Sequence, residues 1–426
     1  MTLNEIISIV SGSTSINSNK KIRKIQTDSR LVSKGDIFIA LKGKKYDGNN
    51  YILDAINKGA IACICENNLC DKCICVKDTR KSLYLIANYI RKKYPIDLIA
   101  ITGSNGKTTT KDLIYHILSS KYNVLYNESN NNNIIGVSKT LFNLNKNHEL
   151  CVIELGSNHI GEISEMSKMI EPNLSIITNI GTSHLEYFKN KKNIFKEKYS
   201  IISGMKEKKL IVNGDDRFLN KIKAYKCGFN KYNNLTFYDV TEYYDHIEFK
   251  VYTDTEYNIV FNYPGRHFII DILLAIETAL RYNISMDCIV SRIADFRMQN
   301  LRMNIKKLNS NIIIEDCYNS SFDSLNAGIE YLKTINERKV LILADMLELG
   351  KHSKRLHKKI NKKLKLLKNK VIYTVGNYTK YIKSKHFNTV NDLLNYLSGI
   401  NIEDSYIYIK GSRKYKLEII TSILNK

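Results

Sequence analysis

Apolar runs alternate with amphipathic stretches through the middle of the chain. The run 96–102 (IDLIAIT) precedes a glycine-containing loop and an amphipathic stretch at 111–120, which predicts a strand, a turn and a helix. Further apolar runs at 150–156, 174–181 and 209–215 are separated by helical stretches. Buried runs that alternate with helices are typical of a mainly parallel sheet with helices on both faces.

The two ends of the chain show similar patterns on a smaller scale. Within residues 1–78, the strand-like runs KIQTDSR, GDIFIAL, AIACICE and CICVK surround one helical stretch, which predicts a mixed α/β unit. Beyond Arg302 the strand-like runs NIIIEDCY, KVLILADM, KVIYTVG and SYIYIKGSR alternate with helical stretches. We therefore expect an α/β protein in which a smaller doubly wound unit follows the central one.

Composition fits an ordinary soluble globular protein of 426 residues, 43% of them hydrophobic and 25% charged. The 65 Lys and Arg exceed the 42 Asp and Glu, which gives a formal net charge of +23. Nucleic-acid binding requires a clustered basic stripe, whereas we interpret the lysines as scattered along the chain, with the run at 351–370 as one example among several. Abundant Lys, Asn, Ile and Tyr with few Pro and Gly indicate an A/T-rich genome. We therefore expect no nucleic-acid partner and assign the charge mainly to solvated faces, and in smaller part to anionic ligands.

Neither export nor membrane insertion is indicated. The opening MTLNEIISIV has no basic segment before a long apolar run, and no run approaches about 18 apolar residues. Nine Cys, an odd number in a long chain, favour reduced thiols and a cytoplasmic location. Cys70 and Cys73 form a C-x-x-C that could be half of a zinc site, but no His lies nearby in the sequence. Because IACIC and CICV alternate as strands do, we expect Cys63, Cys65, Cys73 and Cys75 to fill apolar strand positions.

The loop Gly103–Thr109 (GSNGKTT) is the strongest local signal for chemistry. A glycine-rich turn between a buried strand and a helix directs backbone N–H groups inward, and the helix N-terminus adds positive potential, so the loop can cradle phosphates. Lys107 can reach the β- and γ-phosphates, and the Thr108 hydroxyl suits Mg²⁺. The spacing departs from G-x-x-x-x-G-K-[ST], because Ile101 stands where the first Gly would be.

Three further residues have weaker local signals. Glu154 ends the run 150–156, where a carboxylate beside a phosphate loop can hold Mg²⁺ or be a solvated strand-end acid. His184 follows the run 174–181, and strand ends in an open α/β sheet point at the ligand crevice, although a single His there is more often structural. Lys198 lies in a helical stretch and, seen alone, is typical of a surface lysine.

Seven sequence strings occur in the order found in the Mur ligases, the ATP-dependent amide ligases that build the peptidoglycan stem peptide. They are ITGSNGKTTTK, NNNNIIGV, ELGSNHIGEI, ITNIGTSHLEYF, EDCYNSSFDS, LADMLELG and KGSR. The amino-terminal TDSRLVSKGDIFIALKG, followed by DGNNY, is similar to the family's uridine-nucleotide-binding domain. The chain thus resembles the Mur ligase family over nearly its whole length. DMLELG, KGSR and the Tyr–Asn pair of EDCYN resemble the branch that adds D-alanyl-D-alanine.

This resemblance implies three domains: a UDP-substrate-binding unit at 1–78, a central P-loop ATP-binding domain at 79–303 and a Rossmann-like unit at 304–426. The implied reaction joins UDP-N-acetylmuramoyl-tripeptide to D-alanyl-D-alanine through an acyl phosphate, while ATP is cleaved to ADP and phosphate. ATP and two Mg²⁺ ions are the implied cofactors. The enzyme is expected to act as a monomer.

The resemblance also assigns roles to residues. The ATP-binding set that it implies is Gly103, Ser104, Asn105, Gly106, Lys107, Thr108, Thr109, His267, Asp271, Arg302, Asp316 and Asn319. The implied metal ligands are Thr108, Glu154, His184 and Lys198, with Lys198 carbamylated by CO₂ so that its amine becomes an oxygen donor. The expected catalytic residues are Lys107, His184 and Lys198. Ser29 and Arg30 are expected to meet the uridine nucleotide, and Asn132 and Asn133 the muramyl-peptide.

Several positions depart from the family pattern. In the usual H-N-x-x-N string, which starts here at His267, Phe268 and Asp271 replace two amides that can hydrogen-bond the adenine. The other departures are Leu301, Phe322, Ala344 and Ser200, where the family usually has Gly, Pro, Gly and Glu. The phosphate loop and the implied metal ligands are all retained, so we expect activity to persist.

Three alternatives remain open at this point. The neighbouring Mur ligase adds the third stem-peptide residue, but it carries an arginine-containing DNPR-like selectivity string that this sequence lacks. Folate polyglutamylation is a more distant relative with a different loop. A basic P-loop nucleic-acid-binding ATPase is a third possibility, which ATPase activity stimulated by nucleic acid would favour.

Overall fold

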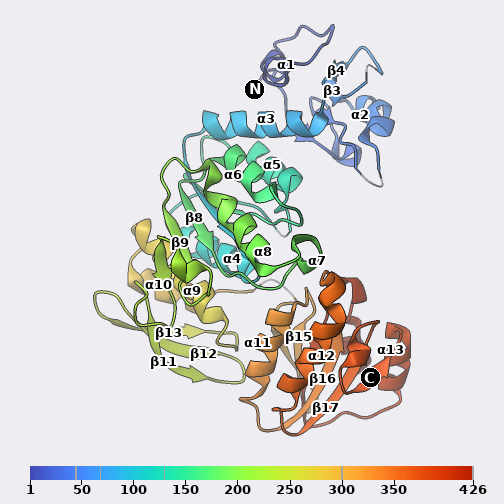
Figure 1. The fold of residues 1–426 in the computed structure, drawn as a ribbon. Helices are drawn as coiled ribbons and strands as arrows, with labels where there is room; N and C mark the ends of the chain where they lie inside the picture. The colour runs from blue at the N-terminus through green and yellow to red at the C-terminus, as the bar shows by residue number, and fades with distance from the viewer. Residues whose placement is uncertain (44–45, 68, 129, 299–300, 425–426) are drawn as a thin grey trace.

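A computed structural model describes residues 1–426 except 44–45, 68, 129, 299–300 and 425–426. Figure 1 shows three successive parts of the chain: a small amino-terminal part, a central part around a large sheet, and a carboxy-terminal part with its own sheet. This three-part α/β architecture confirms the predicted fold class. The predicted domain boundaries at residues 78 and 303 fall between elements of successive sheets and stay predictions.

The amino-terminal part contains a four-stranded parallel sheet in the order β1-β2-β3-β4. Its strands are β1 (Ile25–Gln26), β2 (Ile37–Ile39), β3 (Ala62–Cys65) and β4 (Cys73–Cys75), and its helices are α1 (Leu3–Val10) and α2 (Ile52–Asn57). Cys63, Cys65 and Cys73 are buried among the apolar strand residues, which confirms their predicted role. Among the described residues no group of three or more His, Cys, Asp or Glu could hold a metal ion.

The central part is built on a six-stranded parallel sheet in the order β10-β9-β8-β5-β7-β6. The strands are β5 (Asp97–Thr102), β6 (Val124–Tyr126), β7 (Leu150–Glu154), β8 (Leu174–Ile177), β9 (Leu210–Asn213) and β10 (Tyr225–Cys227). The helices are α3 (Thr79–Lys93), α4 (Lys107–Leu118), α5 (Ile134–Phe142), α6 (Glu162–Ile170), α7 (Leu185–Phe188), α8 (Lys191–Tyr199), α9 (Phe268–Arg281) and α10 (Met286–Ala294). Because β5 lies between β7 and β8, the loops after these three strands meet at the crevice where α/β sheets bind ligands.

A three-stranded antiparallel sheet was not predicted from the sequence. It consists of β11 (Phe237–Glu242), β12 (Ile247–Tyr252) and β13 (Glu256–Phe261), and Figure 1 shows it projecting from the central part. Only alternate residues of β12 are buried, so its apolar side chains are interrupted by Glu248 and Lys250. That alternation is typical of a sheet with one solvated face, whereas the parallel strands appear as continuous apolar runs.

The carboxy-terminal part has a six-stranded mixed sheet in the order β14-β15-β19-β16-β17-β18. The strands are β14 (Asn304–Leu308), β15 (Asn311–Asp316), β16 (Arg338–Ala344), β17 (Lys370–Val375), β18 (Lys385–Phe387) and β19 (Ser405–Lys410). Only β14 is antiparallel to its neighbour. The helices are α11 (Phe322–Leu332), α12 (Ser353–Leu364), α13 (Val390–Ser398) and α14 (Ile419–Leu424). The four strands expected beyond Arg302 are confirmed as β15, β16, β17 and β19.

No helix in the described part of the chain is long and apolar enough to cross a membrane.

Candidate active site

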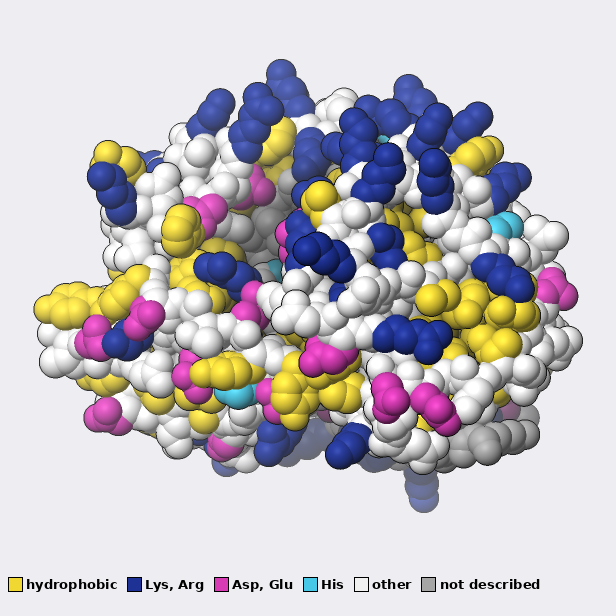
Figure 2. All heavy atoms as spheres, turned by 90° about the horizontal axis from the view of Figure 1, so that it is seen from below, with side chains coloured by type: hydrophobic (Ala, Val, Ile, Leu, Met, Phe, Trp, Pro, Cys, Tyr) yellow, Lys and Arg dark blue, Asp and Glu magenta, His cyan; other side chains and the backbone are white. Residues whose placement is uncertain are grey.

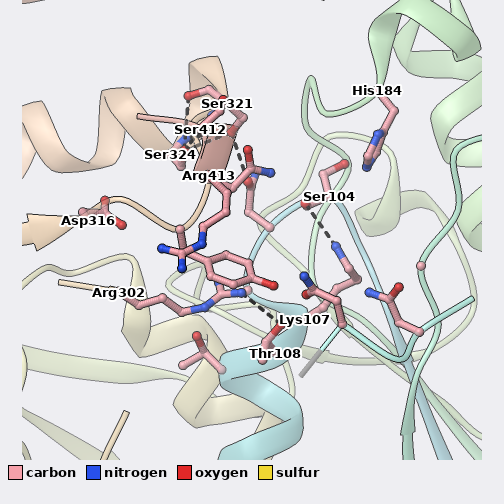
Figure 3. Close-up of a pocket in the computed structure, with 18 of the residues that line it drawn as sticks. Ser104, Lys107, Thr108, His184, Arg302, Asp316, Ser321, Ser324, Ser412 and Arg413 are labelled. Atoms are coloured by element: carbon pink, nitrogen blue, oxygen red, sulfur yellow. Dashed lines mark hydrogen bonds between the residues drawn. The ribbon is translucent and has the colours of Figure 1, made fainter. Parts of the chain in front are cut away.

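The loops at the carboxyl ends of β5, β7 and β8 face the carboxy-terminal domain across a cavity of about 510 Å³. Figure 3 shows Lys107 and Thr108 on one side, with Arg302, Asp316 and Arg413 opposite them. Most of the residues assigned to ATP and metal, and one assigned to the muramyl-peptide, Asn132, line this one cavity. They are Ser104, Asn105, Gly106, Lys107, Thr108, Thr109, Asn132, Glu154, His184, His267, Asp271, Arg302, Asp316 and Asn319.

Close packing shapes the phosphate loop. Gly106 has φ of 79°, and a Cβ at this position would lie 2.2 Å from Asp271 Oδ1, so only glycine fits. Asn105 N–H donates to Asn179 Oδ1 at 3.0 Å, which holds the loop against the end of β8. Helix α4 begins directly after Gly106, so its unpaired N-terminal N–H groups and its dipole favour an anion there.

Lys107 is the half-buried cation at the start of α4. Its Nζ lies 3.4 Å from the Ser104 carbonyl oxygen, a long hydrogen bond that leaves donor capacity free. Burial lowers the pKa of Lys107, and the neighbouring Glu154 carboxylate opposes that effect. An anion in the cavity would favour the charged form of this lysine.

Glu154 ends β7, and its side chain is only 1% exposed. Its Oε2 accepts a hydrogen bond from Thr108 Oγ1 at 2.8 Å, and its Oε1 accepts one from Asn132 Nδ2 at 2.8 Å. Arg302 Nη2 donates to the same Thr108 hydroxyl at 3.2 Å. The carboxylate and the hydroxyl therefore form a compact pair of oxygens beside the phosphate loop.

Asn127, which the sequence analysis did not single out, fixes the backbone of Glu154. Its Oδ1 accepts from Glu154 N–H at 2.8 Å, and its Nδ2 donates to the Glu154 carbonyl at 3.0 Å. The buried Lys111 Nζ donates in turn to the Asn127 carbonyl at 2.6 Å. A buried lysine and a buried amide thus hold the strand end in place, and no motif indicates either residue.

His184 adopts a left-handed backbone conformation with φ of 57°, immediately before α7. Its Nδ1 lies 2.7 Å from Glu348 Oε2, a close polar contact without hydrogen-bond alignment. The neighbouring imidazole holds the pKa of Glu348 below its ordinary value. Glu348 belongs to the LADMLELG string, but its role could not be inferred without the juxtaposition of the two domains.

Lys198 is not a surface residue, because its side chain is only 2% exposed. Its Nζ donates to Ser157 Oγ at 3.0 Å. Ser157 lines the cavity, whereas Lys198 lies behind it. Burial lowers the pKa of Lys198 to about 7, and the nearby Lys107 adds to this effect. A large fraction of this amine is therefore neutral at physiological pH.

The opposite wall is formed by Arg302, just before β14, and by residues of the carboxy-terminal domain. The guanidinium of Arg302 lies 4.1 Å from the centre of the Tyr318 ring. Asp316 accepts a hydrogen bond from Tyr408 at 3.0 Å and pairs with the buried Lys410. Lys410 belongs to the KGSR string, although the sequence assigned it no role.

Three hydrogen-bonded contacts join the central and carboxy-terminal domains beside the cavity. Glu186 N–H donates to the Glu348 carbonyl at 3.0 Å. Ser321 Oγ donates to Asn105 Oδ1 at 3.0 Å. Asp323 Oδ2 accepts from the Thr182 N–H at 2.6 Å and from its hydroxyl at 2.7 Å. The structure therefore has the two domains closed on each other.

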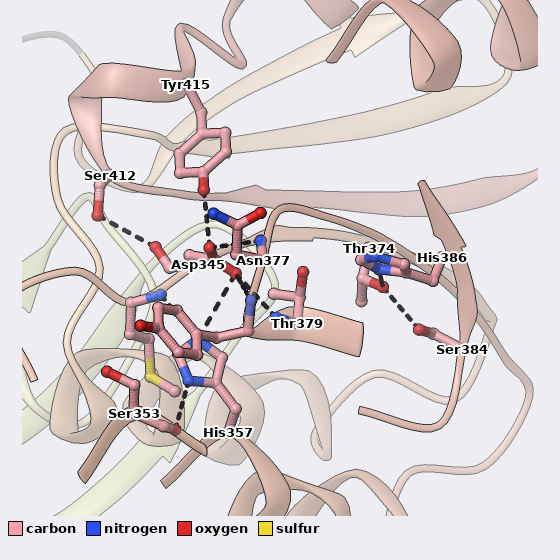
Figure 4. A network of polar contacts seen from close by, with 12 residues as sticks. Asp345, Ser353, His357, Thr374, Asn377, Thr379, Ser384, His386, Ser412 and Tyr415 are labelled. Carbon is pink, nitrogen blue, oxygen red and sulfur yellow. Dashed lines mark hydrogen bonds and ion pairs between the residues drawn. The ribbon is translucent and has the colours of Figure 1, made fainter. Parts of the chain in front are cut away.

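A polar network behind the cavity holds the loops of the carboxy-terminal wall (Figure 4). The buried Asp345 follows β16, and its carboxylate accepts from the backbone N–H groups of 377–379 at 2.8–2.9 Å and from Tyr415 at 2.8 Å. Met346 N–H donates to His357 Nε2 at 3.0 Å. The loops tied together in this way present five residues to the cavity: Leu347, Glu348, Ser412, Arg413 and Lys414.

Asp271 occupies the place of a usual family amide, in the first turn of α9. Thr110 Oγ1 donates to its Oδ1 at 3.1 Å. Burial raises the pKa of Asp271 to about 8, and only Thr110 and Arg302 oppose the shift. A protonated carboxyl group at this position can donate a hydrogen bond, as the amide would.

Some assigned residues are not part of the cavity wall. Gly103 and Asn133 do not line it, and Asn133 instead caps α5 by accepting from Gly136 N–H at 3.0 Å. Ser29 and Arg30 lie in the amino-terminal part, where Arg30 is exposed and forms a bidentate ion pair with the Asp28 carboxylate. This pair holds the pKa of Asp28 at about 2.

Comparison with known proteins gives the same family along the whole chain. Residues 101–279 match the Mur ligase middle domain, 301–413 the Mur ligase glutamate ligase domain and 21–95 the Mur ligase family catalytic domain. A UDP-N-acetylmuramoyl-tripeptide–D-alanyl-D-alanine ligase of Rickettsia prowazekii is 32% identical, with 96% of this chain and 95% of that protein covered. The enzyme of that name from Escherichia coli is 29% identical, with 100% and 98% covered.

Solved structures extend the similarity to the fold. A crystal structure of MurF from Acinetobacter baumannii superposes with a TM-score of 0.93 at 27% identity, covering 100% of this chain and 98% of that one. MurF from Thermotoga maritima in complex with ADP has a TM-score of 0.87 at 24% identity, covering 95% and 97%. With the phosphate loop, the carboxylate beside it and the closing third domain in place, the chain belongs to the Mur ligase family of ATP-dependent, ADP-forming peptide ligases.

Proposed function

We propose that this Mur ligase joins D-alanyl-D-alanine to UDP-N-acetylmuramoyl-tripeptide. The observation that carries the proposal is the single cavity in which the phosphate loop Gly103–Thr109 faces Arg302, Asp316 and Asn319 of the carboxy-terminal side. This arrangement supports an ATP molecule held between the two domains. Relatives named for this activity match nearly the full chain at 29–32% identity, and they support the choice of substrates.

Charge around the cavity fits a polyphosphate. The cations among its lining residues are Lys107, Arg302, Lys410, Arg413 and Lys414. The N-terminus of α4 adds backbone donors on the same side as Lys107. The γ-phosphate would then lie near Thr108 and Glu154, and the nucleoside end would lie toward Asp316.

Thr108, Glu154 and His184 fit Mg²⁺, because this ion binds proteins through one or two carboxylates and completes its shell with phosphate oxygens and water. When bound, Mg²⁺ supplies charge neutralisation for phosphoryl transfer. Asn132 holds the Glu154 carboxylate and Asn127 holds the Glu154 backbone, so that the carboxylate is fixed in place for such an ion.

In the proposed reaction, the C-terminal carboxylate of the tripeptide attacks the γ-phosphorus of ATP, and ADP leaves as the bond to its β-phosphate oxygen breaks. The amine of D-alanyl-D-alanine then attacks the acyl carbon, phosphate leaves with its oxygen, and the amine loses a proton. Activation is necessary because a free carboxylate has no good leaving group. Lys107 would stabilise the charge on the transferred group. The closed contacts Ser321–Asn105 and Asp323–Thr182 would keep water away from the acyl phosphate.

We include a carbamate on Lys198 in this proposal. A neutral amine attacks CO₂, a C–N bond forms and a proton leaves, which gives a carboxylate-like group. The lowered pKa of Lys198 supports this step, because the amine must be unprotonated to react. Its contact with Ser157 places the Nζ next to the cavity wall, so a carbamate would extend toward the metal side.

The uridine diphosphate end of the substrate is proposed to lie in the amino-terminal domain, near Ser29 and Arg30. Arg30 is exposed and so can exchange Asp28 for a phosphate. Asn132, which lines the cavity, and Asn133, which caps α5, are proposed to meet the muramyl-peptide.

An omission assay tests the proposal. ADP release is measured with ATP, Mg²⁺, UDP-muramyl-tripeptide and D-alanyl-D-alanine, each left out in turn. Full turnover should need all four, and Lys107→Ala should abolish it, whereas the exposed Lys146→Ala serves as a matched control and keeps activity. Turnover with UDP-muramyl-dipeptide and a diamino acid would instead assign the chain to the ligase that adds the third residue. Stimulation by nucleic acid alone would refute both.

A further inference from the structure

More than half of the net charge is concentrated in one segment of the carboxy-terminal domain. Residues 351–385 contain 13 Lys and Arg and no Asp or Glu, whereas the rest of the chain has 52 Lys and Arg against 42 Asp and Glu. The scatter of lysines expected from the sequence therefore holds only outside this segment. A codon bias toward lysine acts along the whole chain and does not explain why acidic residues are missing here.

Helix α12 arranges these charges on one side. Its apolar residues Leu356, Ile360 and Leu364 are buried against the domain. Basic residues recur three or four positions apart on the other side, which places them along one helix face. We call the exposed ones of α12, together with Lys351 before the helix and Lys365 and Lys368 after it, the basic face: Lys351, Lys354, Arg355, Lys358, Lys359, Lys362, Lys365 and Lys368.

The charge of the basic face is not neutralised within the described residues. The ion pair formed there by α12 joins Lys363, which is not a member of the face, to Glu330 at 3.2 Å. Figure 2, which views the molecule from below, shows dark-blue side chains gathered at the upper right, over the carboxy-terminal domain. A concentrated field of one sign attracts an extended anionic partner.

We propose that the basic face docks the enzyme on the surface of an anionic phospholipid bilayer, without insertion. A 12-residue helix is about 18 Å long, and a planar surface can meet all the cations along it at once. Leu366, 59% exposed between Lys365 and Lys368, can enter the headgroup layer. Because the remaining apolar residues of α12 are already buried, the attachment is electrostatic and reversible.

Nucleic acid is less well suited to this face. Single-stranded binding relies on exposed aromatic rings on which bases stack. Tyr381, beside the face, is covered by Lys354 and Lys380, whose Nζ atoms lie 5.2 and 5.7 Å from the ring centre. Phe322 lies under Lys359, whose Nζ is 5.3 Å from its ring centre. Tyr378 is 40% exposed, but its ring is already stacked on His357. The observations therefore favour a lipid surface over a polynucleotide.

Vesicle binding tests the proposal on the full-length enzyme. Co-sedimentation is measured with vesicles of phosphatidylglycerol and phosphatidylcholine, and with vesicles of phosphatidylcholine alone, at low and high salt. The test variant carries Lys358→Gln, Lys362→Gln, Lys365→Gln and Lys368→Gln, four exposed residues outside the proposed active site. The matched control carries the same change at four exposed lysines of the central domain: Lys206, Lys208, Lys221 and Lys223.

We expect the wild type to bind only the anionic vesicles and to be released by salt. The test variant should partition about 600-fold more weakly, since each of the four cations removed contributes roughly a fivefold factor near such a surface. The control variant should bind nearly as the wild type does, and both variants should keep ligase activity with soluble substrates. Three results would overturn the proposal: no wild-type binding at low salt, equal losses in both variants, or stronger binding to an RNA oligonucleotide than to the vesicles at equal salt.

Discussion

Replacing Lys198 by alanine tests the residue for which sequence and structure differ most. The local sequence is typical of a surface lysine, whereas the structure buries this side chain. With a pKa of about 7, about half of the Lys198 amines are neutral at pH 7, whereas a lysine of ordinary pKa 10.5 is about 0.03% neutral. The reactive amine is therefore more abundant by about three orders of magnitude. Since a carbamate there would add an oxygen donor on the metal side of the cavity, we expect Lys198→Ala to lower kcat by at least about 100-fold.

Three measurements separate a carbamate from other roles of Lys198. ¹³C NMR of the enzyme in ¹³C-bicarbonate should show a carbamate signal that Lys198→Ala lacks. A small carboxylic acid should partly restore activity to Lys198→Ala, whereas a small amine should not. Lys196→Ala, an exposed lysine on the same helix, should behave as the wild type. Full activity of Lys198→Ala, or rescue by the amine alone, would refute the reasoning.

The contribution of Lys198 to the stability of the folded protein changes with pH in a definite direction. Its pKa is lowered in the folded state, so between about pH 7 and 10.5 the unfolded chain binds more protons than the folded one. The stability cost of burying this lysine is fully present below pH 7 and disappears as the pH rises through that window. In bicarbonate-free buffer, Lys198→Met should therefore raise the melting temperature most at low pH and least near pH 10. A melting-temperature difference that does not change with pH would contradict the lowered pKa.

Three further changes probe the rest of the site. Asn127→Leu removes both side-chain hydrogen bonds to the Glu154 backbone, so the Mg²⁺ concentration needed for activity should rise about 10- to 100-fold. Electron paramagnetic resonance should show weaker Mn²⁺ binding, and an unchanged metal affinity would contradict the role of Asn127. Asp323→Ala removes two hydrogen bonds between domains, so small-angle scattering should show a larger radius of gyration without ligand and KM for ATP should rise; an identical profile would mean that other contacts suffice for closure. Asp271→Asn should keep near wild-type activity, because the native carboxyl group is protonated at neutral pH. Because the pKa of Asp271 is raised, the folded protein binds one more proton than the unfolded chain between about pH 4 and 8. The stability that this proton contributes is lost as the pH rises through 8, so Asp271→Asn should be more stable than the wild type at pH 9. Equal stability of the two proteins from pH 5 to 9 would contradict the assignment.

The sequence was sufficient for the parts of the fold that depend on continuous apolar runs. Strands β5, β7, β8 and β9 and the helix after the phosphate loop were predicted from such runs and are confirmed. Strands β11–β13 were missed because their burial alternates, and β6, β10, β14 and β18 because none of them lies in a long apolar run. Short strands are held by their neighbours rather than by their own composition.

Within the site, the sequence could identify those residues whose spacing along the chain is enough to indicate their chemistry. The loop Gly103–Thr109 and the strand-end Glu154 are of this kind. Lys198 illustrates the limit, because its spacing in a helical stretch does not reveal burial. Asn127, Lys111 and Glu348 illustrate another limit, since their roles arise from contacts across 16 to 164 residues of sequence that no local pattern records.

The identity of the product tests the central claim most directly. The purified enzyme is incubated with ATP, Mg²⁺, UDP-N-acetylmuramoyl-tripeptide and D-alanyl-D-alanine, and the uridine-containing product is identified by mass spectrometry. The account predicts a UDP-N-acetylmuramoyl-pentapeptide, formed in equal amount to the ADP released. ADP without pentapeptide, or a tripeptide product formed only from UDP-N-acetylmuramoyl-dipeptide and a free amino acid, would contradict it.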